Sequence, residues 1–152
     1  MTRCLFPKQA DNAYRGHKVA LWLFGFIVFV KTAIGAGTIF NGRVAAVNAD
    51  GIPLDTFGSA GAQAFISIFA AWGLSQLMLS AVAILVLVRY RSLVPFMFTV
   101  LLLEHVARRV IFAVLPMPRL GSPPGFWINM ALLGIMVAGL MLSLARRGPG
   151  VE

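Results

Sequence analysis

The chain is short of cysteine and of acidic residues. Its single cysteine, Cys4, excludes an intramolecular disulfide, redox chemistry by a thiol pair and any multi-cysteine metal or iron–sulfur site. Five Asp and Glu residues stand against 13 Lys and Arg, and charged residues make up only 12% of the sequence. Soluble domains carry roughly 25% charged residues, so this chain lacks the groups that normally form a water-facing surface.

Hydrophobic residues make up 59% of the 152 residues, and the mean hydropathy is +0.86. A core of this size cannot bury so much apolar surface, so the remainder has to face lipid. The net charge of +8 does not point to nucleic acid, because the basic residues are dispersed at the ends of hydrophobic runs and form no basic stripe. The expected partner is therefore the lipid bilayer, and nucleic-acid binding is rejected.

Four hydrophobic stretches reach the roughly 20 residues that a helix needs to cross about 30 Å of hydrocarbon. They lie at about 19–40, 65–88, 93–115 and 126–144. A polar loop at 41–61, a short turn at 89–92 and a proline-rich loop at 116–124 separate them. The sequence predicts an all-α integral membrane protein, a bundle of four transmembrane helices that forms a single membrane domain over residues 1–152.

The distribution of Lys and Arg predicts the orientation of this bundle. One side would carry Arg3, Lys8, Arg15, Lys18, Arg89, Arg91, Arg146 and Arg147, whereas the loops of the other side hold only Arg43 and Arg119. The positive-inside rule places the first side in the cytoplasm. Residues 1–18 are then a cytoplasmic N-terminal segment and 145–152 a cytoplasmic tail. No small-residue cleavage site follows the first apolar run, so we expect it to remain as an anchor.

Several ionisable residues interrupt the predicted membrane spans. They are Lys31 in the first span and Glu104, His105, Arg108 and Arg109 in the third. Each costs at least about 2.5–3.5 kcal/mol in hydrocarbon unless it is paired or wetted, and such residues suggest a functional site. A rise of 1.5 Å per residue puts Lys31 and Glu104 roughly 17–18 Å from the inner surface, so the two could form an ion pair.

Further polar residues fall at compatible depths and extend this group. Glu104 and Arg108 are four residues apart, as are His105 and Arg109, so each pair shares a helix face. The sequence predicts one polar cluster that opens towards the outer face of the membrane. Its members are Lys31, Gln76, Glu104, His105, Arg108, Arg109 and Asn129.

Two interpretations of this cluster remain open. In the first, Lys31, Glu104 and Arg108 neutralise one another and fix the packing of the helices. In the second, Arg108 and Arg109 hold the acidic or carbonyl headgroup of a ligand. The other histidine, His17, belongs to the opposite end of the bundle, so a haem held by two histidines at one depth is not expected. No catalytic residue, metal ligand or required cofactor is predicted, and the 41–61 loop is expected to cap the outer mouth.

Part of the third span resembles a group of known proteins. Residues 89–95 (RYRSLVP), followed by Leu102-Leu103-Glu104-His105 and Arg108-Arg109, look like small bacterial four-helix membrane proteins of uncharacterised function, and the overall layout is similar to DoxX-like proteins. The resemblance implies a four-helix bundle in the bacterial inner membrane. It implies no reaction, because DoxX-like proteins vary in their roles.

These observations predict a non-enzymatic integral membrane component. It would be an accessory subunit, with a membrane protein or a second copy of itself as partner, or a binder of a lipophilic or anionic small molecule through the polar cluster. The alternative is a quinone-linked oxidoreductase subunit or a small proton-coupled transporter that uses Glu104 and His105.

Overall fold

The computed structural model describes residues 9–145, and this part of the chain is helical without any strand. The long helices are α2 (Lys18–Phe40), α4 (Ser59–Arg89), α5 (Val94–Val114) and α6 (Pro124–Leu144). Short helical segments connect them: α3 (Gly42–Val44), η1 (Ala45–Ala49), η2 (Leu54–Thr56) and η3 (Arg91–Leu93). The predicted all-α class is therefore correct.

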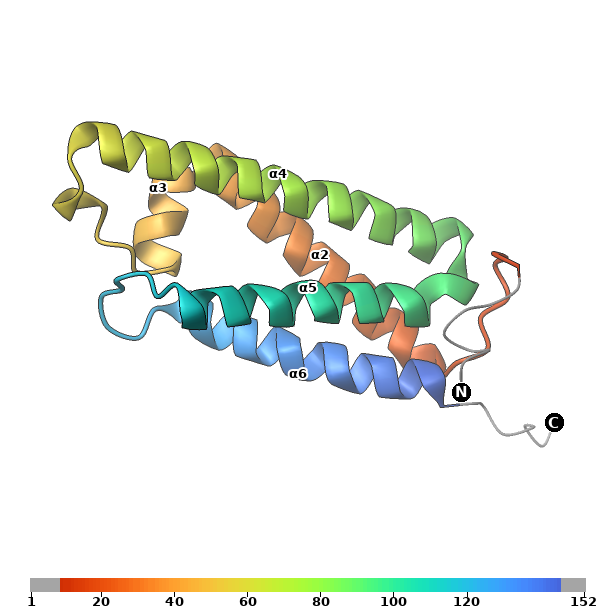
Figure 1. The fold of residues 1–152 in the computed structure, drawn as a ribbon. Helices are drawn as coiled ribbons and strands as arrows, with labels where there is room; N and C mark the ends of the chain where they lie inside the picture. Colours follow the sequence, from red (N-terminus) through yellow and green to blue (C-terminus); the bar gives the residue numbers. More distant parts are fainter. Residues whose placement is uncertain (1–8, 146–152) are drawn as a thin grey trace.

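Consecutive long helices run in opposite directions (Figure 1). His17 N–H donates to the Leu142 carbonyl at 3.2 Å, which ties the start of α2 to the end of α6. At the same end, Ser92 N–H donates to the Asp11 carbonyl at 3.2 Å, and this bond ties the α4–α5 turn to the segment before α2. We call this the turn end of the bundle, and the other end, formed by α3, η1, η2 and the α5–α6 loop, the cap end.

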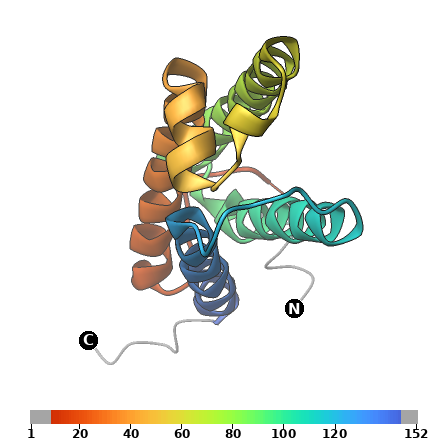
Figure 2. The same ribbon diagram turned by 90° about the vertical axis from the view of Figure 1, so that its left-hand side faces the viewer.

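The helices do not surround their common axis evenly. α2 packs most extensively against α4 and then against α6, and α5 packs mainly on α6. α4 and α5 meet near η3 and diverge towards the cap end, as the end-on view in Figure 2 shows. The bundle is consequently tight around α2 and loose between α4 and α5.

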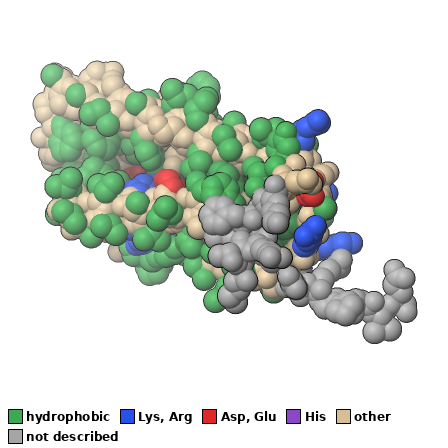
Figure 3. Space-filling model, turned by 45° about the vertical axis from the view of Figure 1, so that its right-hand side comes forward, with side chains coloured by type: hydrophobic (Ala, Val, Ile, Leu, Met, Phe, Trp, Pro, Cys, Tyr) green, Lys and Arg blue, Asp and Glu red, His purple; other side chains and the backbone are tan. Residues whose placement is uncertain are grey.

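Three helices, α2, α4 and α6, are long and apolar enough to cross a membrane by length and composition. Large apolar side chains cover the outside of the molecule (Figure 3), among them Trp22 at 81% and Ile68 at 72% exposure. Soluble monomers rarely expose such extensive apolar surface. The prediction of an integral membrane protein thus holds in its general form. α5 is absent from the set of three, and it carries Glu104, Arg108 and Arg109.

The apolar core lies in the half of the bundle nearest the turn end. Phe24 of α2 and Phe98 of α5 are fully buried and meet edge to face, with ring centroids 5.0 Å apart. A second, smaller cluster of Ala46, Ile52 and Leu54 lies at the cap end. The polar residues of the predicted spans lie between these two clusters.

Several predicted helix bounds need correction. The second helix begins at Ser59 rather than near residue 65, because hydropathy detects the apolar part of a helix and misses its polar first turns. The third begins at Val94 after the 3₁₀ turn of η3, and the fourth begins at Pro124, since proline is favoured in the first turn. The 41–61 segment is largely helical and not an irregular loop. Residues 1–8 of the predicted cytoplasmic segment and residues 146–152 of the predicted tail lie outside the described residues.

Glycine sets the closeness of α2 and α4. A Cβ atom on Gly73 would lie 2.9 Å from the Gly35 carbonyl oxygen and 3.0 Å from Thr38 Cβ. Real Cβ contacts are not so short, so the two backbones approach as closely as they do only because a side chain is missing, as is common in membrane helix packing.

We expect Gly73→Leu to separate α2 from α4 and to lower the free energy of unfolding by about 1–3 kcal/mol or more, as overpacking does. Gly134→Leu on α6 is the matched control, because a Cβ there meets nothing within 4 Å. Thermal unfolding in lipid nanodiscs measures both variants. Equal losses in the two would show that the α2–α4 contact has no special role.

Candidate functional site

Lys31 forms the centre of a polar cluster in the middle of the bundle. Its side chain is only 3% exposed. Its Nζ donates to Glu104 Oε2 at 2.7 Å and to Gln76 Oε1 at 3.1 Å, and Gln76 Nε2 donates to Glu104 Oε1 at 2.8 Å. The three side chains come from α2, α4 and α5, so this closed ring ties three helices together. The ion pair that the depth arithmetic suggested is present.

Arg108 extends the ring towards the cap end. Its Nε lies 3.6 Å from Glu104 Oε1, one helical turn away on α5. Its guanidinium lies over the ring of Trp72 on α4, with Cζ 5.0 Å from the centroid. A guanidinium over an indole face is a favourable cation–π contact. Arg108 therefore contacts both helices that diverge towards the cap end.

His105 is buried at 1% exposure, and the contacts of its two ring nitrogens differ. Arg108 Nη2 lies 3.3 Å from His105 Nδ1. A guanidinium can only donate, so Nδ1 accepts and the neutral ring carries its hydrogen on Nε2. Within the described residues this buried Nε2 has no hydrogen-bond partner. A buried donor without an acceptor costs about 1–3 kcal/mol, so it would gain from a ligand that accepts.

Arg109 does not join His105, although their spacing suggested a shared face. Arg109 Nη1 lies 3.2 Å from Met130 Sδ, and its guanidinium lies over the Phe126 ring at 5.5 Å. It therefore points towards α6. His105 contacts Arg108 instead, because residues three apart are also neighbours on a helix.

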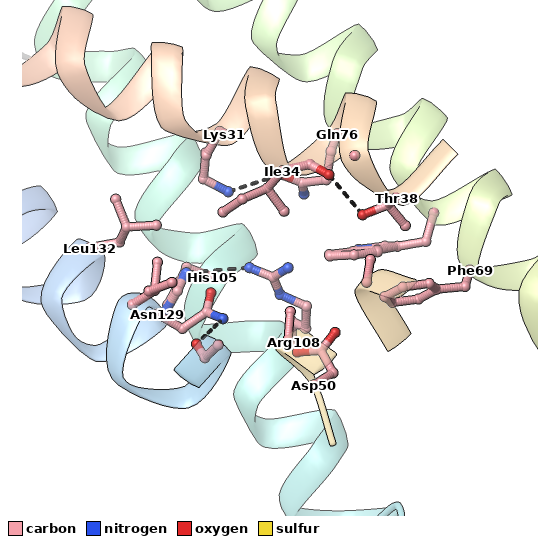
Figure 4. A pocket seen from close by; sticks show the side chains of 16 residues that line it. Lys31, Ile34, Thr38, Asp50, Phe69, Gln76, His105, Arg108, Asn129 and Leu132 are labelled. Atoms are coloured by element: carbon pink, nitrogen blue, oxygen red, sulfur yellow. Dashed lines mark hydrogen bonds between the residues drawn. The ribbon is translucent and has the colours of Figure 1, made fainter. Parts of the chain in front are cut away.

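A cavity of about 170 Å³ lies beside the cluster on its cap-end side (Figure 4). Of the predicted residues, it is lined by Lys31, Gln76, His105, Arg108 and Asn129. Glu104 and Arg109 do not line it. Asn129 donates from Nδ2 to the Gly125 carbonyl at 2.7 Å, in the first turns of α6. The structure thus brings most of the predicted cluster to one cavity.

Sequence reasoning missed other residues of the cavity wall, among them one acidic and two aromatic residues: Asp50, Phe69 and Trp72. Trp72 lies one turn before Gln76 on α4, so its place on the same face was a signal that the sequence contained. Asp50 follows η1, and nothing in its neighbourhood in the sequence marks it. Burial raises the pKa of the Asp50 carboxyl above its ordinary value, and Arg119 and Arg108 oppose part of this rise.

The charges and donors of the site favour an acceptor-bearing ligand. Three cationic side chains, Lys31, Arg108 and Arg109, are near two carboxylates, those of Glu104 and Asp50. The described residues contain no group of three His, Cys, Asp or Glu side chains that could hold a metal ion. The site is thus suited to bind an anion or a carbonyl oxygen through nitrogen donors.

We expect Lys31→Met to lower the free energy of unfolding by about 3–5 kcal/mol, because it leaves the Glu104 carboxylate buried without its main partner. Lys31→Met with Glu104→Leu would still leave the Gln76 amide unsatisfied. The triple variant that adds Gln76→Leu should therefore recover the most stability, as measured by chemical denaturation in detergent micelles. Strictly additive losses across the series would show that the three residues do not act as one ring.

Comparison with protein-family models, curated protein sequences and solved structures gives no match to this chain. The resemblance to DoxX-like proteins therefore stays a prediction, and the function has to be argued from the site.

Proposed function

We propose that the protein is a non-enzymatic membrane component that binds a small molecule with an acidic or carbonyl headgroup in the cavity beside His105. The observation that carries this proposal is a cavity whose wall holds the Arg108 guanidinium and the ring of His105, and the buried Nε2–H of that ring has no partner among the described residues. Arg108, on the next turn of α5, supplies a positive charge at the same wall.

The size of the cavity limits the group that it accepts. Its volume is about 170 Å³. An engineered apolar cavity of about 150 Å³ holds benzene, so this cavity has room for one ring or a compact headgroup and not for a whole amphiphile. Apolar side chains such as Ile34 and Leu132 complete its walls. The ligand would therefore place a small polar head here and any longer chain elsewhere.

The polar cluster can be interpreted either as a network that fixes helix packing or as a ligand site. Each interpretation then applies to a different part of the cluster. Each of Lys31, Gln76 and Glu104 finds its main partners within the ring, which joins three helices. Arg108 keeps N–H donors at the cavity wall, and His105 keeps one buried Nε2–H without a partner among the described residues. These different contacts support a ligand-binding role. They give less support to an accessory subunit without a ligand, whose partner would be a membrane protein or a second copy of the chain.

The alternative functions have less support from the geometry. A proton-coupled transporter or a quinone-linked oxidoreductase subunit would need Glu104 or His105 as a proton acceptor. Both carboxylate oxygens of Glu104 already accept hydrogen bonds, and His105 Nδ1 faces a guanidinium. These contacts favour the ionised carboxylate and the neutral ring, so taking up a proton would cost either residue part of its bonding.

The proposed setting is the bacterial inner membrane, with α2, α4, α5 and α6 all crossing and both chain ends in the cytoplasm. The charges of α5 do not oppose this, because Glu104 and Arg108 are paired and both arginines contact aromatic rings. Paired and aromatic-covered charges are the form in which membranes tolerate them. The DoxX-like layout belongs to the same proposal.

Cysteine labelling tests whether α5 crosses the membrane. With Cys4 replaced by Ser, we expect Ser122→Cys in the α5–α6 loop to react with a membrane-impermeant maleimide in intact cells. Cys4 of the unaltered chain should react only after permeabilisation, since the first residues are predicted to be cytoplasmic. If α5 did not cross, residue 122 would share the side of Cys4, and both would need permeabilisation.

Mass spectrometry of the gently purified protein tests ligand binding. We expect a stoichiometric small molecule that falls by about 10- to 100-fold in His105→Phe and in Arg108→Ala, since each removes a hydrogen bond to the ligand. Arg43→Ala is the control, because Arg43 makes an exposed ion pair with Asp55 at the cap end. A co-purifying membrane protein with no small molecule would instead identify an accessory subunit.

A further inference from the structure

We propose that the ligand is a long-chain monoanion of the bilayer, of the carboxylate type, and that it reaches the cavity sideways through an opening between α4 and α5. This inference rests on the proposed function and adds the chemical class of the ligand and its route. It depends on four features: an open side, a closed end, an apolar wall and an excess of positive charge.

The open side lies where α4 and α5 diverge. Glu104 and Arg108 are in the middle of the bundle, yet their side chains keep 25% and 18% exposure. Figure 3 shows acidic and basic side chains in a hollow on an otherwise apolar side of the molecule. Pairing makes these two charges tolerable in a membrane, but the parts of them that still face hydrocarbon carry a cost. A polar headgroup that covered them from the lipid side would remove this cost.

The cap end, by contrast, is closed by packed backbone and side chains. Ala46, Ile52 and Leu54 are at most 1% exposed, and they pack against Phe57, Phe65, Ile66, Phe69 and Met117. The Gly51 carbonyl accepts from Leu120 N–H at 2.8 Å, which ties the cap to the α5–α6 loop. A Cβ on Gly125 would lie 2.6 Å from the Ala49 carbonyl oxygen, so α6 is pressed against the cap as well. The cap therefore separates the cavity from water.

The wall of the opening suits an acyl chain. On α4, Phe65, Phe69 and Trp72 stack in series, with centroids 5.6 and 5.3 Å apart. On α5, Ile111 lies about 20° around the helix from the direction of Glu104 and is 54% exposed. An apolar chain between these surfaces would be continuous with the lipid, while its head reached the cavity.

The charge balance selects an anion over a neutral carbonyl compound. Among the described residues no carboxylate pairs with Arg109, and Glu104 is the carboxylate that pairs with both Lys31 and Arg108. With Asp50 included, the three cations of the site exceed its two carboxylates by one. One added negative charge would offset this excess. A carboxylate can also accept hydrogen bonds from the Arg108 guanidinium at the cavity wall, and hydrogen bonds between ionised groups are the stronger kind.

Quenching of Trp72 fluorescence tests the proposed class. Trp22 and Trp127 are 81% and 64% exposed, so Trp22→Phe with Trp127→Phe leaves Trp72 as the single reporter at low structural cost. In nanodiscs, nitroxide-labelled stearate should quench Trp72 saturably and bind about tenfold or more tightly than its methyl ester. Arg108→Gln should abolish this preference, because a salt-bridged hydrogen bond is worth roughly tenfold or more in affinity.

Two positions on α5 test the route. Ala107 and Val106 are both exposed. At about 100° per residue, Ala107 lies roughly 60° from Glu104 on the edge towards α4, whereas Val106 lies on the far side. Ala107→Phe should therefore slow the onset of quenching by about tenfold, as a blocked gate does. Val106→Phe should leave it unchanged.

Three results would overturn the inference. Equal quenching by the stearate and its ester would remove the charge argument. Displacement of the stearate by water-soluble benzoate, with no effect of Ala107→Phe, would show access from water. A photocrosslinker at residue 107 that captured a protein helix would show that a partner covers the opening. A small molecule that still co-purified and depended on His105 would leave the proposed function standing in the first two cases.

Discussion

The buried ammonium group of Lys31 needs hydrogen-bond acceptors, and the packing of the helices depends on supplying them. Lys31 lies on the helix that contacts α4 and α6 most, and its side chain is almost completely removed from solvent. Breaking a buried ion pair by removing one partner costs several kcal/mol. Glu104 of α5 and Gln76 of α4 must therefore stay within reach of Lys31. That requirement fixes the rotation and depth of three helices relative to one another.

The same arrangement leaves one side of the bundle open. Gly35 and Gly73 let α2 and α4 approach backbone to backbone, and Gly139 of α6 accommodates the buried ring of Phe98. α4 is drawn to α2 and α5 to α6, so the α4–α5 contact is the weakest among sequential long helices. Long polar side chains then bridge the gap: Glu104 reaches Lys31 and Gln76, and Arg108 reaches Trp72. The polar cluster and the opening are two consequences of one packing pattern.

The ionisable residues of the cluster differ in their contacts. Some of them join helices, and others border the cavity. The Lys31–Gln76–Glu104 ring has few unused groups and acts as a structural element. His105 and Arg108 share one hydrogen bond and border a cavity, with one buried donor left over. A purely structural network would be expected to satisfy every member, because an unsatisfied buried polar group is costly. That remaining donor, together with the cavity that the same ring lines, is what supports the proposed binding role.

The sequence by itself determined the all-α class and the expectation of a lipid setting, because long apolar runs favour lipid and helices satisfy their own backbone there. It also determined the depth match of Lys31 and Glu104, since a constant rise per residue converts position into height. It could not show that His105 pairs with Arg108 while Arg109 turns to α6, because both spacings are compatible with contact on a helix. Nor could it show that Asp50 lines the cavity, or that α4 and α5 diverge. Those features depend on how the helices rotate and cross, and side-chain packing between distant segments decides that.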